Sequence, residues 1–235
     1  MTKALVLSGD GINSDKELAL ALEAVGFKTD FALLNDLAAV KLADYDLLAI
    51  AGGFSYADDL GSGKVAALKI KKIWQQEIKD FIAAKKLILG ICNGFQVLVQ
   101  MGLLPDESKQ AALSFNDTQE FINKWVEVKI NPKVKSPWFT DKQKQTFYLP
   151  IRHAEGKFIT KTAVRPEQIA LTYIANPNGS MHDIAGLVDK EGLVFGLMPH
   201  PEAAYEDFQI PLKDKTPYAK EIFKNAYNYL RSKNL

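Results

Sequence analysis

The sequence predicts an α/β protein with a doubly wound, mostly parallel β-sheet. Short apolar runs that are typical of buried strands alternate with segments whose apolar residues recur at helical spacing. The loops between them are short, and strands that alternate with helices through short loops form parallel sheets. The chain of 235 residues is long enough to bury a substantial core. We therefore expect residues 1–235 to form a single domain.

The first half of the chain carries the clearest alternation. Gly26 ends the first predicted helix, because glycine readily adopts the left-handed conformation found at helix C-termini. The expected strands are Ala4 to Leu7, Phe27 to Leu33, Leu47 to Ala51 and Leu87 to Ile91, and the expected helices are Ser14 to Val25, Lys64 to about Ala84 and a helix from Phe95 onward. Ligands of doubly wound sheets bind at the carboxyl ends of strands, which places Gly52, Gly53 and Cys92 at the functional edge.

The second half is richer in strands. The expected elements are strands at Trp125 to Ile130, Phe147 to Ile151, Ile169 to Tyr173, Ile184 to Val188 and Leu193 to Met198, followed by a helix at Tyr218 to Leu230. Lys133 to Gln145 is rich in Lys, Pro and Gln and is the most loop-like segment. We expect it to be either a flexible excursion or a segment that contacts a partner.

Composition excludes several functional classes. The 29 Lys and Arg against 28 Asp and Glu give a formal net charge of +1, which offers no footprint for nucleic acid or an anionic membrane. No apolar run approaches the roughly 18 residues of a membrane span. The N-terminus is typical of a first strand rather than a signal peptide. A single Cys excludes an internal disulfide, which fits a reducing compartment. We expect a cytoplasmic protein that binds neither nucleic acid nor membrane.

The cysteine lies where a predicted strand meets a predicted helix. Gly90 and Gly94 bracket Cys92 in a G-x-C-x-G pattern, the cysteine form of the nucleophile elbow. The turn is too tight for side chains at the flanking positions. A helix N-terminus stabilises a thiolate, and the backbone N–H of Asn93 can face a developing oxyanion. A lone cysteine is more often a small buried hydrophobe, but the two glycines at a strand-to-helix turn favour a nucleophile.

A cysteine nucleophile needs a base, and the base needs a group that orients it. Of the three histidines, His182 lies in a turn with no clear strand before it, and we expect it at the surface. His153 and His200 each stand two residues before a glutamate, Glu155 and Glu202, and residues two apart in an extended backbone point to the same side. The spacing cannot choose between them. The buried run and the two prolines that flank His200 favour it, and His153 remains the alternative.

These motifs together resemble those of class I glutamine amidotransferases. The resemblance rests on Gly90-Ile-Cys-Asn-Gly-Phe-Gln96 and Pro199-His-Pro-Glu202. Within that class the chain resembles the glutaminase subunits of phosphoribosylformylglycinamidine synthase, through Gly11-Ile-Asn13, Gly52-Gly-Phe-Ser-Tyr-Ala-Asp58, His153-Ala-Glu-Gly156, Asn176-Pro-Asn-Gly-Ser180 and Ile184-Ala-Gly186. The motifs occur in the order of the family and cover most of the chain.

The resemblance implies a flavodoxin-like α/β domain and a glutaminase reaction. In the family the thiolate at the position of Cys92 attacks the side-chain carbonyl of glutamine. The base falls on His200, and Glu202 orients its imidazole. The backbone N–H groups of Gly53 and Asn93 are expected to form the oxyanion hole. The resemblance implies no metal ion or cofactor in this chain.

The resemblance also implies a substrate and partners. Gly52, Gln96 and the loop from Asn116 to Phe121 are expected to bind L-glutamine, with main-chain groups around Phe121 meeting its α-carboxylate. The ammonia is expected to pass to a synthetase subunit, which binds ATP and Mg²⁺ and converts formylglycinamide ribonucleotide to the amidine. A small accessory subunit is expected in the same complex.

Several positions depart from the family pattern. Ala203 stands where the family commonly has Arg, Ala57 and the residues after it alter the loop that follows Gly53, and Glu120 stands where a basic residue is usual. None of these changes removes a catalytic group. They bear on the partner surface and on the tightness of glutamine binding.

Two alternatives remain. The chain could be another class I amidotransferase or a γ-glutamyl hydrolase of the same fold, against which the motifs at 153–156 and 176–180 argue. It could also be a non-catalytic regulatory subunit, against which the intact Cys92, His200 and Glu202 argue.

Overall fold

The computed structural model describes residues 1–105, 110–140, 146–211 and 218–233. The helices in these ranges are α1 (Asp15–Glu23), α2 (Lys64–Ala83), α3 (Asn93–Met101) and α4 (Ala219–Lys233). The strands are β1 (Lys3–Ser8), β2 (Lys28–Leu33), β3 (Leu47–Ile50), β4 (Leu87–Ile91), β5 (Ala111–Ser114), β6 (Ile122–Ile130), β7 (Thr146–His153), β8 (Lys157–Thr160), β9 (Ile169–Tyr173), β10 (Ile184–Val188) and β11 (Val194–Leu197).

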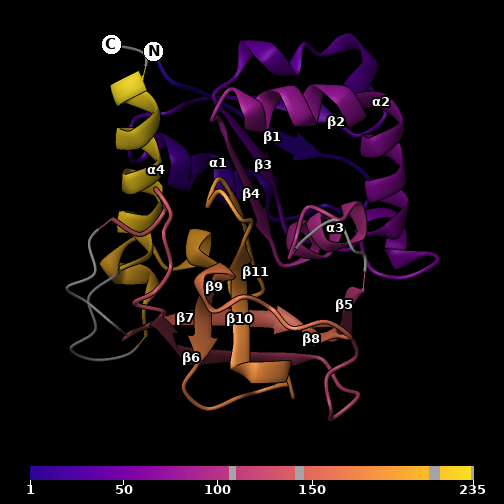
Figure 1. Ribbon diagram of the computed structural model, residues 1–235, viewed down its shortest axis with the longest axis vertical. Coiled ribbons are helices and arrows are strands. Elements are labelled where there is room, and N and C mark those ends of the chain that lie inside the picture. The colour runs from indigo at the N-terminus through magenta and orange to yellow at the C-terminus, as the bar shows by residue number, and fades with distance from the viewer. Residues whose placement is uncertain (106–109, 141–145, 212–217, 234–235) are drawn as a thin grey trace.

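Nine of these strands form one sheet in the order β2-β1-β3-β4-β11-β10-β9-β6-β7, and β5 pairs with β8 in a second, two-stranded sheet (Figure 1). The strands from β2 to β11 are parallel to one another. From β11 to β7 each neighbouring pair is antiparallel. The sheet is therefore mixed. The sequence predicted its parallel half, and the antiparallel half follows because no α-helix separates β9, β10 and β11 to make the crossover that parallel strands require.

Helices cover both sides of the parallel strands (Figure 1). Helix α1 packs on β1 and β2 and contacts α4, whereas α2 and α3 pack together and against β4. Every residue of β3 and β4 is buried, which explains why these strands are continuous apolar runs rather than alternating ones. None of the helices in the described ranges is long and apolar enough to cross a membrane.

The observed bounds of β4, β9 and β10 coincide with the predicted strands. Strands β5 and β8 were not predicted, because each is a short run with no strong alternation. The expectation of a flexible excursion is wrong for residues 133–140, which form no helix or strand but bury Trp138 and Phe139 in the core. The indole N–H of Trp138 donates to the Leu193 carbonyl at 3.2 Å. Residues 141–145 of the same segment lie outside the described residues.

The C-terminal end of β7 extends beyond the part of β6 that pairs with β9. Strand β9 pairs with β6 only at Val128–Ile130, whereas β7 follows β6 back to the pair Ile122 and His153. This end of β7 lies at the carboxyl edge of the parallel strands. There the His200 N–H donates to the Pro150 carbonyl at 2.9 Å. A strand distant in the sheet order thereby becomes a wall of the candidate site.

Candidate active site

Cys92 occupies a strained turn between β4 and α3. Its backbone has φ 52° and ψ −106°, a combination that non-glycine residues rarely adopt. A Cβ built on Gly94 would lie 2.0 Å from the Ile50 carbonyl oxygen, and one on Gly90 would lie 2.6 Å from the Gly94 oxygen. Both positions therefore require glycine, and the predicted elbow is confirmed.

The Cys92 side chain is buried against the end of β7. The Cys92 N–H donates to the Leu197 carbonyl at 2.8 Å, which fixes the elbow to the end of β11. The thiol sulfur lies 3.8 Å from the Arg152 carbonyl oxygen. At the start of α3 the N–H of Asn93 has no carbonyl partner within the helix, so it is available to an anion beside the sulfur.

His200 and Glu202 form a buried pair. His200 Nδ1 lies 2.6 Å from Glu202 Oε1, and because a carboxylate only accepts, Nδ1 is the donor. Within the described residues Nε2 has no hydrogen-bond partner. Burial pushes the pKa of His200 down, but the Glu202 charge and then the Cys92 thiol outweigh it and raise the pKa to about 10. An imidazolium is therefore favoured while Cys92 is a thiolate.

The backbone of Gly52 abuts both His200 and Cys92. A Cβ built on Gly52 would lie 3.0 Å from His200 Cε1 and 3.4 Å from Cys92 Cβ. Cys92, in the turn after β4, and His200, in the turn after β11, thus meet at a glycine that follows β3. The Gly52 carbonyl accepts the N–H groups of Asn13 and Ser14, each at 3.2 Å, so it faces the protein and not the site.

The loop that contains Gly53 is tied to the elbow by the Asn93 side chain. The Ser55 N–H donates to Asn93 Oδ1 at 3.2 Å. Next to Gly53, the Phe54 N–H donates to the Gly11 carbonyl at 2.7 Å. These bonds hold the two predicted oxyanion-hole residues on neighbouring segments, and their role in the reaction stays a prediction.

Asp58 supports the same side chain and was not assigned a role from the sequence. Asn93 Nδ2 donates to Asp58 Oδ1 at 3.0 Å, and the Gly63 N–H donates to the same oxygen at 3.3 Å. Burial raises the pKa of Asp58 above its ordinary value. The signal available in the sequence was its place six residues after Gly52, in a loop that already carried the resemblance.

Gln96 is buried, with 5% of its surface exposed. Its Nε2 donates to the Glu155 carbonyl at 2.6 Å, and its Oε1 accepts from Asn93 Nδ2 at 2.9 Å. Gln96 thus joins α3 to the turn after β7. A contact with glutamine would use its remaining N–H, and that role stays a prediction.

The Asn116 side chain makes four hydrogen bonds within the protein. Its Nδ2 donates to the carbonyls of Glu120 and His153, each at 2.9 Å. Its Oδ1 accepts from His153 Nδ1 at 3.1 Å and from the Gly156 N–H at 3.2 Å. These four bonds use the whole capacity of the amide, and the expected role of the loop from Asn116 to Phe121 in binding glutamine stays a prediction. Asn116 instead holds its loop against the turn at 153–156.

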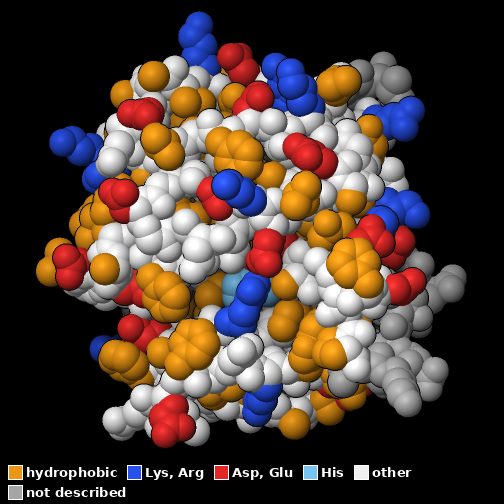
Figure 2. Space-filling view, turned by 180° about the vertical axis from the view of Figure 1, so that it is seen from behind, with side chains coloured by type: hydrophobic (Ala, Val, Ile, Leu, Met, Phe, Trp, Pro, Cys, Tyr) orange, Lys and Arg blue, Asp and Glu red, His pale blue; other side chains and the backbone are white. Residues whose placement is uncertain are grey.

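Phe121, at the end of this loop, lies on the surface beside Phe54. The two side chains are 53% and 44% exposed, and their ring centroids are 6.4 Å apart. Figure 2 shows histidine atoms at the bottom of a hollow near the centre of this face, between basic, acidic and hydrophobic side chains. The main-chain role expected near Phe121 stays a prediction.

His153 is a structural histidine in this arrangement. Its ring lies over Gly156, where a Cβ would be 2.2 Å from His153 Cε1. Its Nδ1 is held by Asn116 and not by Glu155, although both histidines share the H-x-E spacing. Burial, and then the charge of His200, lower the pKa of His153 to about 4, so the ring is neutral at pH 7. The sequence could not show that the orienting group came from another loop.

The protonation of His153 predicts an acid-sensitive fold. The unfolded chain takes up a proton near pH 6.5 and the folded chain only near pH 4, so stability is lost as pH falls through that window. We expect wild type to lose about 3 kcal/mol more than His153→Gln between pH 7 and pH 4. Urea unfolding at both pH values measures this. Equal losses in the two proteins would contradict a neutral buried imidazole.

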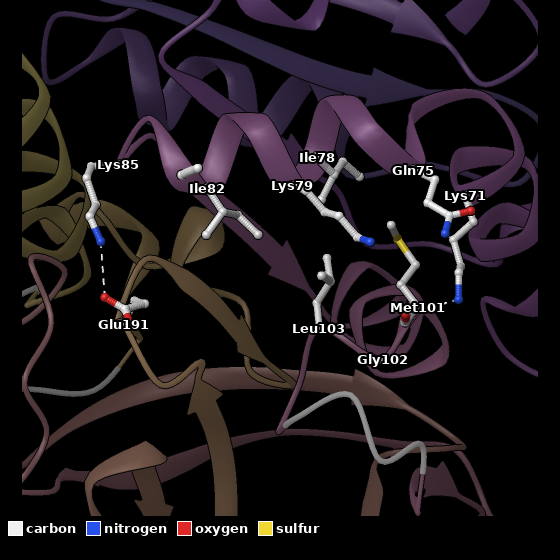
Figure 3. A pocket seen from close by; sticks show the side chains of 11 residues that line it. Lys71, Gln75, Ile78, Lys79, Ile82, Lys85, Met101, Gly102, Leu103 and Glu191 are labelled. Carbon is white, nitrogen blue, oxygen red and sulfur yellow. Dashed lines mark hydrogen bonds and ion pairs between the residues drawn. The ribbon is translucent and has the colours of Figure 1, made fainter.

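His182 and a pocket beside α2 lie away from Cys92. His182 is exposed, as expected. A pocket of about 530 Å³ lies between α2 and the C-terminal end of α3 (Figure 3). Its lining carries no thiol, hydroxyl or imidazole; Lys85 pairs with Glu191 and Lys71 donates to the Met101 carbonyl. The described side chains include no group of three or more His, Cys, Asp and Glu placed to hold a metal ion.

The comparisons with known proteins agree with this geometry. A model of the CobB/CobQ-like glutamine amidotransferase domain matches residues 1–230, which defines the class of protein as a glutamine amidotransferase. A phosphoribosylformylglycinamidine synthase subunit PurQ from Methanococcus maripaludis is 39% identical over 266 residues, covering 97% of each chain. The PurQ subunit from Thermotoga maritima is 39% identical over 230 residues, covering 97% of this chain and 98% of that one.

A solved structure agrees as well. A chain in the structure of PurLQS from Thermotoga maritima matches with a TM-score of 0.83 and 36% identity, over 97% of this chain and 99% of that one. The chain described here belongs to the PurQ family of glutamine amidotransferases.

Proposed function

We propose that this chain is the glutaminase subunit of phosphoribosylformylglycinamidine synthase, and that Cys92, His200 and Glu202 form its catalytic triad. The observation that carries the proposal is the buried His200–Glu202 pair beside a cysteine on a strained elbow. The identity to PurQ subunits along almost the whole chain supports the assignment of the substrate.

The proposed reaction begins with attack of the Cys92 thiolate on the side-chain carbonyl carbon of glutamine. The N–H groups of Gly53 and Asn93 stabilise the oxyanion, and loss of one such donor typically costs about 2.7 to 4 kcal/mol. His200 donates its proton to the amide nitrogen, the C–N bond breaks and ammonia leaves. His200 then takes a proton from water, which hydrolyses the thioester and releases glutamate and the thiolate. Glu202 orients the imidazole throughout.

The proposal also covers the fold, the partner subunits and the location of this chain. The parallel strand order β2-β1-β3-β4-β11 supports a flavodoxin-like, doubly wound description, and we take residues 1–235 as one domain. The match to a chain of PurLQS supports a synthetase partner that receives the ammonia. ATP and Mg²⁺ bind to that partner, and this subunit carries no cofactor. A small accessory subunit completes the complex, which works in the cytoplasm.

The proposed partnership predicts that the isolated chain is a poor glutaminase and that its synthetase activates it. We expect the rate of ammonia release from glutamine to rise about 10-fold or more when the synthetase subunit is added, because closure around the mouth of the site excludes water and orders the substrate. The coupled assay is run with and without the partner. Strong turnover by the isolated chain, unchanged by the partner, would instead indicate a free-standing γ-glutamyl hydrolase.

A further inference from the structure

The Glu202 carboxylate is fully buried, and its hydrogen bonds use only part of its capacity. Oε1 accepts from His200 Nδ1 at 2.6 Å, while Oε2 is buried without a hydrogen-bond partner among the described residues. A buried carboxylate is costly unless positive charge compensates it. His200 supplies that charge only while it is protonated, and the reaction proposed above requires it to give its proton away. A permanent positive charge nearby would stabilise Glu202 in that step.

Arg152 carries such a charge near the end of β7. One guanidinium nitrogen lies 3.9 Å from Glu202 Oε1 and 3.2 Å from Glu17 Oε2. The side chain of Glu17 is 48% exposed, that of Arg152 34% and that of Glu202 0%, so the charges run from solvent into the interior. Both β7 and α1 pack against the turn Pro201–Ala203 that carries Glu202. The Arg152 carbonyl also lies 3.8 Å from the Cys92 sulfur.

We propose that Arg152 is a positioning residue for the glutaminase reaction, and that its guanidinium compensates the buried charge of the Glu202 carboxylate and holds this carboxylate directed at His200. This inference rests on the function proposed above. The guanidinium acts from beyond hydrogen-bond distance, so its effect on Glu202 is electrostatic. An arginine stays charged at every pH at which the protein is folded, whereas His200 does not.

The sign of the effect follows from the charges around the pair. Among the described residues, the ionisable groups near His200 and Glu202 are Arg152 with its partner Glu17, the Cys92 thiol and the neutral His153. Of these, Arg152 alone disfavours proton binding by the pair through a fixed positive charge. Its removal therefore makes the pair bind protons more tightly, and deprotonation of His200 then requires a higher pH.

A plain surface ion pair is the competing interpretation. An exposed Arg152–Glu17 pair would contribute little to stability and nothing to the pH dependence of the site. The two interpretations differ in their effect on kcat and on its pH profile. Three variants separate them: Arg152→Gln removes the charge, Arg152→Lys keeps it, and Arg165→Gln removes the same charge from an exposed position where the arginine bonds to Gln168.

The first measurement is glutaminase kinetics in the complex with the synthetase. We expect Arg152→Gln to lower kcat about 10-fold, with the KM for glutamine within about twofold, and to move the acid limb of the kcat profile up by about half a pH unit. Arg152→Lys should restore most of kcat, and Arg165→Gln should match wild type. A raised KM with unchanged kcat would assign Arg152 to substrate binding and overturn the proposal.

The second measurement needs no turnover. The chain contains one cysteine, so alkylation by iodoacetamide reports on Cys92 alone. In the isolated chain we expect the pH midpoint of alkylation to rise by about half a unit in Arg152→Gln and to stay at the wild-type value in Arg152→Lys. An unchanged midpoint in Arg152→Gln, or an equal shift in both variants, would overturn the role of Arg152. A wild-type complex that released no ammonia would overturn the proposed function separately.

Discussion

Ammonia release from glutamine is expected to fall by on the order of 10⁴-fold or more in Cys92→Ala, assayed with the synthetase present. In the proposed reaction the thiolate sulfur forms the covalent bond, and no other nucleophilic side chain lies in the elbow from Gly90 to Gly94. The fold should survive, because alanine has almost the same volume and keeps the backbone at φ 52°. Equal ammonia release by wild type and Cys92→Ala would end the enzyme hypothesis and favour a regulatory subunit.

The matched variant Cys92→Gly separates catalysis from backbone strain. Glycine adopts positive φ without the steric cost of a Cβ, which is about 1 to 3 kcal/mol at such positions. Its greater freedom in the unfolded chain offsets about 0.5 to 1 kcal/mol of this gain. We expect Cys92→Gly to be as inactive as Cys92→Ala but more stable by about 1 kcal/mol in urea unfolding. A less stable glycine variant would contradict the strained elbow.

Gly94→Ala is expected to destabilise the protein by about 3 kcal/mol or more. The new Cβ would lie 2.0 Å from the Ile50 carbonyl oxygen, and neither β3 nor α3 can move away without breaking its own packing. The sign of the change in the free energy of unfolding is diagnostic. Gly94 lies within α3, and in a helix alanine is ordinarily more stable than glycine by up to about 1 kcal/mol. Chemical denaturation measures the free energy of unfolding directly.

The control for Gly94 is Gly61→Ala. A Cβ on Gly61 would meet nothing within 4 Å, although its φ of +108° strains any other residue. We expect a loss of about 1 to 2 kcal/mol from that strain alone. If Gly94→Ala cost no more than Gly61→Ala, close contact between α3 and β3 would not be what the elbow glycines provide.

The features that the sequence predicted are local ones. The buried strands β3 and β4 are covered on both faces, so continuous apolar runs identify them without further knowledge of the fold. The elbow was predictable because its pattern lies within five residues, and because the contact of a Cβ on Gly90 with the Gly94 oxygen lies within the turn itself. The choice of His200 over His153 needed the family resemblance, because both share one spacing.

The features that the sequence missed depend on contacts between distant segments. Three of the four hydrogen bonds of the Asn116 amide join it to the turn at 153–156, which no local pattern reveals. Arg152 lies near Glu202 because β7 continues along β6 beyond the residues that pair with β9, and this end of β7 lies at the carboxyl edge of the parallel strands. Trp138 lies in a segment with the composition of a loop and is buried by its contact with the residue before β11.

A covalent intermediate on Cys92 is the most direct test of the central claim. The complex with the synthetase is mixed with glutamine, quenched in acid within milliseconds and digested, and the peptide that carries Cys92 is weighed. The account predicts a γ-glutamyl thioester on Cys92 that is absent in Cys92→Ala and that disappears as glutamine is consumed. Steady ammonia release with no acyl group on this peptide at any time would contradict it.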